Sequence, residues 1–310
     1  MIYDLIIIGS GPAGLSAAIY AMRAKMNTLV IEQSGVSGGQ VLTTYEVDNY
    51  PALPGISGYE LGMKMREHAD KLGAVFMDAG VTNIINDGKT KTVVTTNGTY
   101  ETRAIMIATG AAHAKLNVPG EETLAGMGVS YCATCDGAFF RDKTTVVVGG
   151  GDVAVEDAIF LARFCKKVYL VHRRDSLRAA KILQERLDEQ ERIEVIWNSV
   201  VTEIQGEEQV EAVQLKDVIT GEETKLETQG IFIAVGIHPN SAVFMPLLKT
   251  DKAGYIDADE TGITNIPGIF AAGDVRTKQL RQIVTAVADG ANAITSVQNY
   301  FLTNKNEKNI

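Results

Sequence analysis

The sequence predicts an α/β fold of two similar units, each built on a parallel β-sheet, with the second unit inserted into the first. Two observations predict it. A strand, a glycine-rich turn, a helix and a second strand follow one another twice, and the corresponding residues Gly9 and Gly149 are 140 positions apart. Each copy is followed by short β-like runs that lead to an apolar strand, which is typical of a three-layer ββα unit.

Length and composition limit the classes of protein to which the chain can belong. Its 310 residues suffice for about two domains. With 45% hydrophobic and 22% charged residues, it is typical of globular proteins rather than collagen-like or disordered chains. Three cysteines do not suit a secreted disulfide framework and favour a reducing compartment. A net charge of −9 disfavours nucleic acid as a partner.

The sequence contains no pattern for membrane insertion or export. No run of about 18 apolar residues is present, so we expect no transmembrane helix and no membrane partner. The chain opens with Met1-Ile2-Tyr3-Asp4, which has an acid where a targeting signal carries basic residues. We therefore expect a cytoplasmic protein.

The first copy of the repeat lies near the N-terminus. Residues 5–8 predict a buried strand that ends in the turn Gly9-Ser10-Gly11-Pro12-Ala13-Gly14. A helical stretch through Met26 and a second strand over residues 28–31 follow, and this strand closes on Glu32.

The second copy lies in mid-chain and has the same internal length. Residues 145–148 predict a buried strand that ends in Gly149-Gly150-Gly151-Asp152-Val153-Ala154. A helix to about Cys165 and a strand over residues 168–171 follow, and this strand closes on His172. Like the first glycines, Glu32 and His172 are 140 positions apart.

A glycine-rich turn between a strand and a helix is suited to a dinucleotide. The first glycine permits the sharp turn, the second lets a pyrophosphate approach the backbone, and the third small residue lets the helix pack on the strand. The helix N-terminus adds unpaired N–H groups and a positive dipole. A purely structural turn is the alternative for either copy. Two copies in the same context favour two Rossmann-like dinucleotide sites.

The tips of the second strands distinguish the two expected nucleotides. Glu32 can accept hydrogen bonds from ribose hydroxyls and would repel a 2′-phosphate. The second copy has no acid there and instead carries Arg173, Arg174 and, one helical turn further on, Arg178. Guanidinium groups bind a phosphate bidentately, which favours NADP over NAD. The alternative is a solvated basic helix start, paired with nearby carboxylates.

The remaining runs repeat the same order in each half. Residues 81–107 predict an antiparallel meander that leads to Gly110, and runs between residues 195 and 226 repeat this pattern before residues 231–236. Residues 268–274 predict a strand that closes on an acid, and residues 282–302 a helix with an apolar stripe.

Prolines mark where the chain crosses between the two domains. Pro119 and Pro239 lie in the expected crossover segments. We therefore expect one domain of residues 1–114 and 244–310, with residues 115–243 inserted into it as a second domain.

The segment Cys132-Ala133-Thr134-Cys135-Asp136 is the one suited to redox chemistry. Two thiols at this spacing can form a small-ring disulfide, and a helix start stabilises one thiolate. A zinc site needs about four ligands, whereas only Cys165 and four scattered histidines remain, so we expect no metal. A chance pair of buried cysteines is the other alternative. Cys165 is expected to be a packed core thiol, and Asp136 suits acid–base work and helix capping equally.

In order and spacing, these motifs resemble the low-molecular-weight bacterial thioredoxin reductases, which are pyridine nucleotide–disulfide oxidoreductases, over essentially the whole chain. The resemblance also rests on Gly38-Gly39-Gln40, Gly273-Asp274 and Arg281-Gln282-Ile283. It implies a homodimeric flavoprotein that passes electrons from NADPH to FAD, then to the Cys132–Cys135 disulfide, and then to thioredoxin.

The resemblance assigns FAD to the first domain and NADPH to the second. For FAD it implies contacts with Gly9, Gly11, Pro12, Ala13, Gly14, Glu32, Gly39, Gln40, Asn49, Gly110, Gly273, Asp274, Arg281, Gln282 and Ile283. For NADPH it implies contacts with Gly151, Asp152, Val153, Ala154, His172, Arg173, Arg174 and Arg178. From the residues alone, the loop at 38–40 and Asn49 resemble ordinary turns.

The resemblance also implies roles for the redox segment. Cys135 would face the flavin, Cys132 would attack the substrate disulfide, and Asp136 would donate or accept the proton. Because the cysteine pair and the NADPH site belong to the same inserted domain, one face of the flavin cannot meet both at once. We therefore expect the domains to rotate between half-reactions.

Two other functions fit the same motifs. One is a flavin-dependent NADPH reductase of another disulfide protein, although such reductases usually carry an extra thioredoxin-like domain. The other is a redox-sensing module that binds flavin only structurally. Bleaching of a yellow protein by NADPH and its reoxidation by a disulfide protein would separate an enzyme from such a module.

Overall fold

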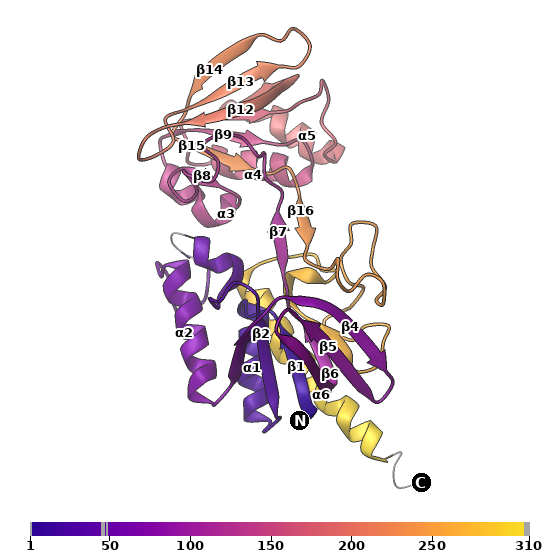
Figure 1. Ribbon diagram of the computed structural model, residues 1–310. Coiled ribbons are helices and arrows are strands. Elements are labelled where there is room, and N and C mark those ends of the chain that lie inside the picture. The colour runs from indigo at the N-terminus through magenta and orange to yellow at the C-terminus, as the bar shows by residue number, and fades with distance from the viewer. Residues whose placement is uncertain (1, 45–46, 48, 307–310) are drawn as a thin grey trace. The chain divides into compact units, whose positions relative to one another are not determined.

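Two β-sheets of mainly parallel strands organise the fold, one in each of two units (Figure 1). The structure is a computed structural model that describes residues 2–44, 47 and 49–306. Unit 1 consists of Met1–Leu42, Val47–Ala112 and His238–Ile310, and unit 2 of Thr43–Glu46 and His113–Ile237. Two short strands, β7 (Ala111–His113) and β16 (Ile237–Pro239), carry the chain between the units and pair with each other.

Unit 1 contains a seven-stranded sheet. Its strands are β1 (Ile2–Ile8), β2 (Thr28–Glu32), β3 (Val75–Asp78), β4 (Val81–Asp87), β5 (Thr90–Thr95), β6 (Gly98–Ile107) and β17 (Ile269–Ala271). The order is β3-β2-β1-β6-β5-β4, with β17 also paired to β6. β1 runs parallel to β2 and β6, and β17 runs parallel to β6. β4, β5 and β6 form the antiparallel meander predicted over residues 81–107.

Alternating side chains along β1 divide unit 1 into layers. Leu5 and Ile7 pack beneath the helices α1 (Pro12–Arg23), α2 (Gly58–Lys71) and α6 (Ile283–Asn306). Ile6 and Ile8 point to the other face, where they meet buried residues of β4 and β5 and of the segment before β17. The central strands are thus covered on both faces, as parallel strands require.

Unit 2 repeats this layering with a five-stranded parallel sheet (Figure 1). Its strands, in the order β11-β10-β9-β15-β8, are β11 (Ile193–Ile196), β10 (Lys167–Val171), β9 (Thr144–Val148), β15 (Gly230–Ile233) and β8 (Val129–Ser130). One face packs on the helices α3 (Ala133–Asp136), η2 (Gly137–Phe140), α4 (Asp152–Ala162) and α5 (Lys181–Asp188). The other face packs on an antiparallel sheet of β12 (Ser199–Gln205), β13 (Ala212–Asp217) and β14 (Glu223–Glu227). The predicted α/β class with ββα layers is confirmed.

The helix after each glycine turn ends earlier than the sequence predicts. α1 ends at Arg23 because Lys25 adopts a left-handed conformation, with φ of +57°, and its amide turns back to the carbonyl of Met22. No glycine marks this stop, so the sequence predicts helix through Met26. α4 likewise ends at Ala162 rather than near Cys165. No helix among the described residues is long and apolar enough to cross a membrane.

We predict that Gly14→Ala destabilises the protein, whereas Gly11→Ala does not. A Cβ on Gly14 would lie 1.9 Å from the carbonyl oxygen of Gly9, and forcing helix and strand apart costs about 1–3 kcal/mol or more. At Gly11, φ is −70° and a Cβ would come no closer than 3.9 Å to the neighbouring backbone. The free energy of unfolding is therefore unchanged there or rises by up to about 1 kcal/mol. Urea unfolding of the cofactor-free variants measures both values, and equal losses would contradict the packing argument.

Candidate functional site

Unit 1 gathers its predicted site residues at one edge of its sheet. β1, β2, β6 and β17 are parallel, so their carboxyl ends lie at the same edge. At these ends, or within three residues of them, lie the first glycine turn, Glu32, Gly110 and the Gly273–Asp274 pair. Open α/β sheets bind their ligands at this edge. The structure therefore brings together residues that the sequence distributes over more than 260 positions.

The first glycine turn contains one glycine that packing does not require. A Cβ on Gly9 would lie 2.5 Å from the carbonyl oxygen of Ala108, so Gly9, like Gly14, is needed for the fold. Gly11 has no such contact and is flanked only by the backbone of Gly38 and Gly39. No described side chain caps the N-terminus of α1, which leaves the N–H groups of its first turn available. Open space beside unpaired N–H groups fits a pyrophosphate.

Glu32 is held as a carboxylate at the tip of β2. Its Oε2 accepts hydrogen bonds from the backbone N and the Oγ of Ser10 at 2.8 and 2.6 Å. Its Oε1 accepts two from Ser34, both at 2.9 Å. Burial acts to raise the pKa of Glu32, but these hydrogen bonds outweigh it and hold the pKa below its usual value. An ionised acceptor beside the glycine turn fits a ribose.

Asp274 and Arg281 retain buried polar atoms that no described residue satisfies. Asp274 lies in the short helix η3 (Gly273–Val275), and its Oδ1 has no partner among the described residues. The same is true of Arg281 Nε, although the guanidinium lies 3.9 Å from the ring centre of Tyr255. Burial raises the pKa of Asp274, while the charges of Lys278 and Arg281 act against it. Because orphaned buried polar atoms are costly, both residues fit a site that a ligand completes.

The other residues predicted to line the flavin also belong to unit 1. Asn49 Nδ2 donates to Gln282 Oε1 at 2.9 Å, across 233 positions of sequence. Gln40 Nε2 donates to the carbonyl oxygen of Ala111, across 71 positions. Ile283 packs on the hydrophobic cluster that covers this loop. Segments that resemble ordinary turns in the sequence are therefore tied to the same unit by long-range contacts.

A buried ion cluster, which the sequence analysis did not identify, lies behind the Gly273–Asp274 pair. Asp289 on α6 accepts hydrogen bonds from Arg276 Nη2 and Nε at 2.6 and 2.8 Å and from Lys278 Nζ at 3.0 Å. These three side chains are at most 6% exposed. The sequence held one signal of this cluster: Asp289 lies within the helix predicted to carry an apolar stripe, and a carboxylate that is buried needs a partner.

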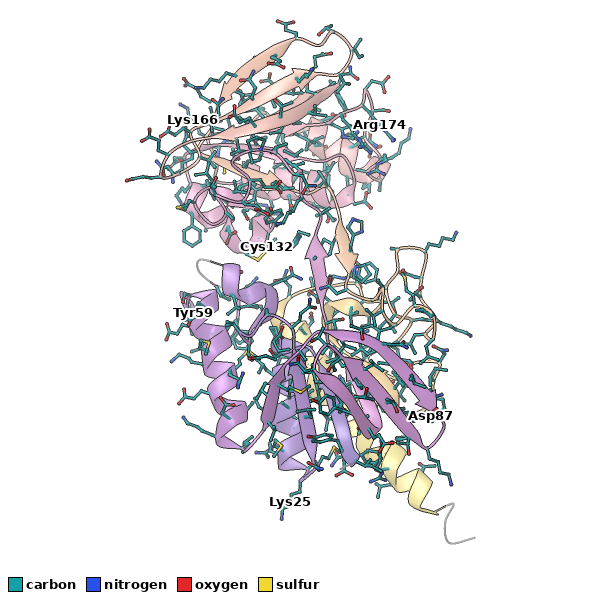
Figure 2. The ribbon with its side chains drawn as sticks, viewed as in Figure 1. Lys25, Tyr59, Asp87, Cys132, Lys166 and Arg174 are labelled. Carbon is teal, nitrogen blue, oxygen red and sulfur yellow. A yellow bond between two sulfur atoms is a disulfide. The ribbon has the colours of Figure 1, made fainter. Side chains whose placement is uncertain are left out.

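Unit 2 also gathers its predicted residues at one sheet edge. β8, β9, β10 and β15 are parallel, and the cysteine pair, the second glycine turn and the arginine cluster follow β8, β9 and β10. Figure 2 labels Cys132 and Arg174 in this unit. Only β15 separates β8 from β9, so the strands before the disulfide and the glycine turn are about 10 Å apart. The redox pair and the expected nucleotide turn therefore share one edge.

The second glycine turn has the same open position as the first. A Cβ on Gly151 would meet nothing within 4 Å, whereas a Cβ on Gly149 would lie 2.5 Å from the Cβ of Ala154. Among the residues that the structure describes, no side chain caps the N-terminus of α4. Val153 is 54% exposed beside it. Gly151 therefore corresponds to Gly11: in each turn it is the glycine whose neighbours would leave room for a side chain.

His172 and Asp152 contact protein rather than open space. The His172 side chain is buried beneath the turn, where a Cβ on Gly150 would lie 2.2 Å from its ring. Its Nε2 lies 3.1 Å from the carbonyl oxygen of Ser176. Asp152 Oδ1 accepts a hydrogen bond from the amide of Ala180 at 2.7 Å. His172 therefore supports the turn from within the protein, and Asp152, which is exposed, fixes the backbone before α5.

The arginine cluster is exposed and carries no carboxylate partner. Arg173, Arg174 and Arg178 are exposed side chains at and after the tip of β10. Within the described part of the chain, none of the three forms an ion pair. The structure therefore does not show the ion pairs with nearby acids that the alternative of a solvated basic helix start requires. Unpaired guanidinium groups are suited to a phosphate.

Cys132 and Cys135 are joined in a disulfide at the start of α3 (Figure 2). Their Cα atoms are 5.3 Å apart. Because both sulfurs are used in this bond, the zinc alternative loses its two thiolates. Cys165 is a free, buried thiol, as expected of a core residue, and burial raises its pKa.

Asp136 is joined to the disulfide segment through Ser130, a residue that the sequence analysis missed. Ser130 Oγ donates to Asp136 Oδ2 at 2.6 Å and accepts from the amide of Cys132 at 3.1 Å. The other carboxyl oxygen, Oδ1, is buried without a partner among the described residues. Burial raises the pKa of Asp136, and the Ser130 hydrogen bond opposes this rise. Such a carboxyl keeps its proton to higher pH than an ordinary aspartic acid, which suits proton transfer more than capping.

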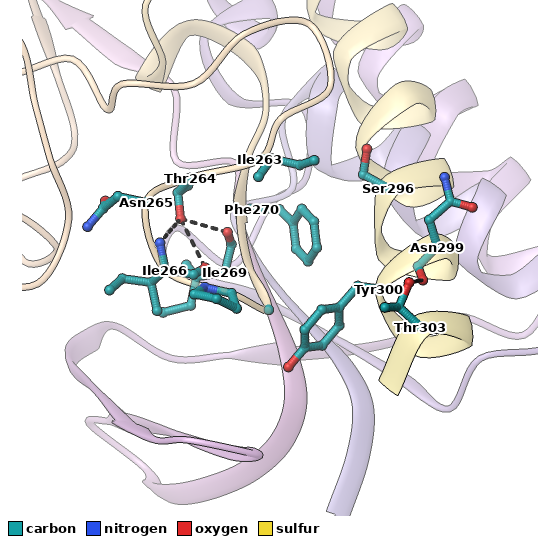
Figure 3. A pocket seen from close by; sticks show the side chains of 12 residues that line it. Ile263, Thr264, Asn265, Ile266, Ile269, Phe270, Ser296, Asn299, Tyr300 and Thr303 are labelled. Atoms are coloured by element: carbon teal, nitrogen blue, oxygen red, sulfur yellow. Dashed lines mark hydrogen bonds between the residues drawn. The ribbon is translucent and has the colours of Figure 1, made fainter. Parts of the chain in front are cut away.

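A groove of about 450 Å³ on unit 1 contains none of the predicted site residues. It lies between the segment at 263–270 and α6 (Figure 3). Thr264 Oγ1 lies within hydrogen-bond distance of backbone atoms of Ile266 and Ile269, so its polar atom is used inside the loop. Polar side chains such as Asn265, Ser296 and Asn299 also line the groove, but none of its lining residues is charged, so it does not suit the phosphates of a dinucleotide.

Comparisons with known proteins give one consistent family. The pyridine nucleotide-disulphide oxidoreductase family matches residues 3–290. A thioredoxin reductase of Bacillus subtilis (strain 168) is 50% identical over 300 residues, which are 96% of this chain and 95% of that protein. A thioredoxin reductase structure from Streptococcus pyogenes MGAS5005 is 50% identical with a TM-score of 0.92 and covers 97% of this chain and 99% of its own. The Lactococcus lactis thioredoxin reductase in its FR conformation is 49% identical with the same coverages and a TM-score of 0.68.

We predict that Ser130→Ala raises the pKa of Asp136. The substitution removes the hydrogen bond that lowers this pKa and leaves the burial that raises it. Titration of the Asp136 carboxyl carbon by NMR in the oxidised protein should show its midpoint at higher pH than in the wild type. Thr134→Ala is the control, because Thr134 Oγ1 contacts Cys132 Sγ at 3.4 Å and not Asp136. A midpoint that stays in place or moves down would show that the hydrogen bond does not stabilise the ionised form.

Proposed function

The chain belongs to the pyridine nucleotide-disulphide oxidoreductase family, and we propose that it carries electrons from NADPH through FAD to the Cys132–Cys135 disulfide and on to thioredoxin. The expected thioredoxin-disulfide reductase activity and the use of FAD and NADPH are confirmed by relatives that are about half identical over nearly the whole chain. One observation supports the assignment of NADPH and the disulfide to unit 2 and of FAD to unit 1: the sheet edge that the redox pair and the second glycine turn share in unit 2. There the disulfide lies beside an open glycine turn and unpaired arginines.

We assign FAD to the sheet edge of unit 1, within the domain predicted from the sequence as residues 1–114 and 244–310. Support comes from the open position at Gly11, the ionised Glu32 and the orphaned Oδ1 of Asp274. Gly11 would let the pyrophosphate reach the backbone, Glu32 would accept the ribose hydroxyls, and Asp274 would complete its hydrogen bonding on the cofactor. When bound, FAD supplies the two-electron link between NADPH and the disulfide.

We assign NADPH to the second domain, residues 115–243. The open position at Gly151 and the uncapped start of α4 support a pyrophosphate there. Arg173, Arg174 and Arg178 would bind the 2′-phosphate that distinguishes NADPH from NADH. His172 would act through the turn that it supports rather than through the nucleotide itself.

The cysteines and Asp136 perform the final exchange. The Cys132 thiolate attacks the substrate disulfide, which forms a mixed disulfide and releases one substrate thiolate. The Cys135 thiolate then attacks the Cys132 sulfur, so the second substrate thiolate leaves and the Cys132–Cys135 disulfide forms again. Each leaving thiolate needs a proton. Asp136 is placed to hold one, because burial keeps its pKa raised.

Three further features belong to this proposal. Thioredoxin is the partner named by the relatives. The homodimer implied by the resemblance and the cytoplasmic location expected from the sequence both stay predictions. Rotation of the domains between half-reactions also stays a prediction. It is supported by the two solved relatives, which have nearly equal identity and coverage but TM-scores of 0.92 and 0.68, so the relatives themselves differ in conformation.

We predict that Cys135→Ser accepts electrons from NADPH but turns over no disulfide. The lone Cys132 can still attack thioredoxin, and without Cys135 the mixed disulfide is not resolved. Anaerobic bleaching of the flavin by NADPH, an NADPH-coupled thioredoxin assay and intact mass after incubation with oxidised thioredoxin measure the three steps. Cys132→Ser is the matched variant, and it should bleach but form no such adduct. An adduct only with Cys132→Ser would reverse the two roles, and turnover by either variant would refute the assignment.

We predict that the double variant Arg173→Ala/Arg174→Ala raises the KM for NADPH by about 10- to 100-fold, because both substitutions remove charge-assisted hydrogen bonds to the 2′-phosphate. The KM for NADH should change by less than about threefold, since NADH lacks that phosphate. Steady-state kinetics with both nucleotides measures the ratio. Lys166→Ala and Lys167→Ala together remove the same charge elsewhere in unit 2 and serve as the control. Equal changes for NADPH and NADH would exclude the phosphate role.

A further inference from the structure

Asp289 lies buried at the second turn of α6 and connects that helix to the residues around Asp274. We propose that Asp289 is a positioning residue for FAD. Its carboxylate pairs with Arg276 and Lys278, so that the carboxylate of Asp274 remains available to the cofactor. This inference rests on the proposed place of FAD beside Asp274. It concerns a contact that the motifs of the sequence do not include.

The first part of the argument is the backbone. Asp289 Oδ2 accepts a hydrogen bond from the amide of Gly273 at 2.9 Å. Gly273 has a φ of +78°, and a Cβ on it would lie 2.8 Å from the Cβ of Ala13. Asp289 thus holds the turn that carries Asp274 against the start of α1, where the first glycine turn ends.

The second part is the pairing of the two cations. Arg276 makes two hydrogen bonds to Asp289, and its Nη1 also donates to the carbonyl oxygens of Ala258 and Thr277 at 3.2 and 2.8 Å. Lys278 has Asp289 as its only hydrogen-bond partner among the described residues. Arg276 is therefore fixed by several groups, whereas the position of the Lys278 ammonium depends on one carboxylate.

The third part is the competition for Asp274. A buried ammonium that loses its carboxylate is costly and moves to another acceptor if one is near. Asp274 offers a buried oxygen without a partner among the described residues, and Lys278 Nζ shares its acceptor, Asp289 Oδ2, with the amide of Gly273, the residue before Asp274. Without the charge of Asp289, Lys278 would therefore occupy the carboxylate that FAD needs.

The test uses Asp289→Asn, which keeps an oxygen to accept from Gly273 and removes the charge. We expect the Kd for FAD, measured by quenching of flavin fluorescence as apoprotein is added, to rise at least about tenfold. Adding Lys278→Met to this variant removes the competing ammonium and should return the Kd to within about threefold of wild type. The melting temperature of each apoprotein is measured alongside, so that a loss of stability is separated from a loss of affinity.

The control is Asp4→Asn, which breaks the Asp4–Arg103 ion pair elsewhere in unit 1 and should leave the Kd unchanged. A lower melting temperature of Asp289→Asn with an unaltered Kd would mean that Asp289 only stabilises the fold, and would overturn the inference. So would a double variant that binds FAD no better than the single one. If Asp289→Asn does not fold, the double variant decides alone: near-normal affinity supports the inference and weak affinity overturns it. Failure of the wild-type apoprotein to bind FAD would instead overturn the proposed function and this inference together.

Discussion

A close approach between two backbone segments underlies the whole of unit 1. The carbonyl oxygen of Gly9 lies where a side chain at position 14 would have to begin, so only glycine lets α1 start directly at the end of β1. Because the helix starts there, its unpaired N–H groups lie at the edge where β2, β6 and β17 also end. This one steric constraint places Glu32 and Asp274 beside the same turn, although nothing in their local sequence relates them.

Unit 2 meets the same constraint with different residues. Its third position is Ala154, and the space comes instead from Gly149, where any Cβ would collide with that of Ala154. Gly150 makes room for the ring of His172, so packing accounts for both of these glycines. The feature common to both turns is the glycine that packing does not require, Gly11 or Gly151. A purely structural turn would not need that glycine, and this distinguishes a dinucleotide site from a tight turn.

The sequence predicted the features that follow a periodic pattern and missed those that depend on irregular turns and loops. The glycine turns, Glu32 and the arginines each follow a buried strand, and hydrophobic periodicity locates such strands. The Ser130–Asp136 hydrogen bond lies within one short segment, but its geometry depends on an irregular turn at the start of α3 with no periodic signal. The early end of α1 at Lys25 likewise uses a left-handed residue that is not glycine. The partners of Asp289 lie 11 and 13 positions away in an irregular loop, where neither period of 2 nor period of 3.6 applies.

The charges of the two units are arranged for different tasks, and burial explains the difference. Guanidinium groups at the tip of β10 are exposed and form no ion pair with a described residue, so water solvates their charge and they are available to a phosphate. Arg276 and Lys278 are buried, and ions in such a place must be paired or lose their charge. Two buried cations on one carboxylate leave an excess of positive charge beside Asp274, whose own buried oxygen lacks a described partner. A buried ion cluster of this kind is weak evidence for stability, and the proposed need to keep Asp274 available to FAD gives these charges a role in ligand binding.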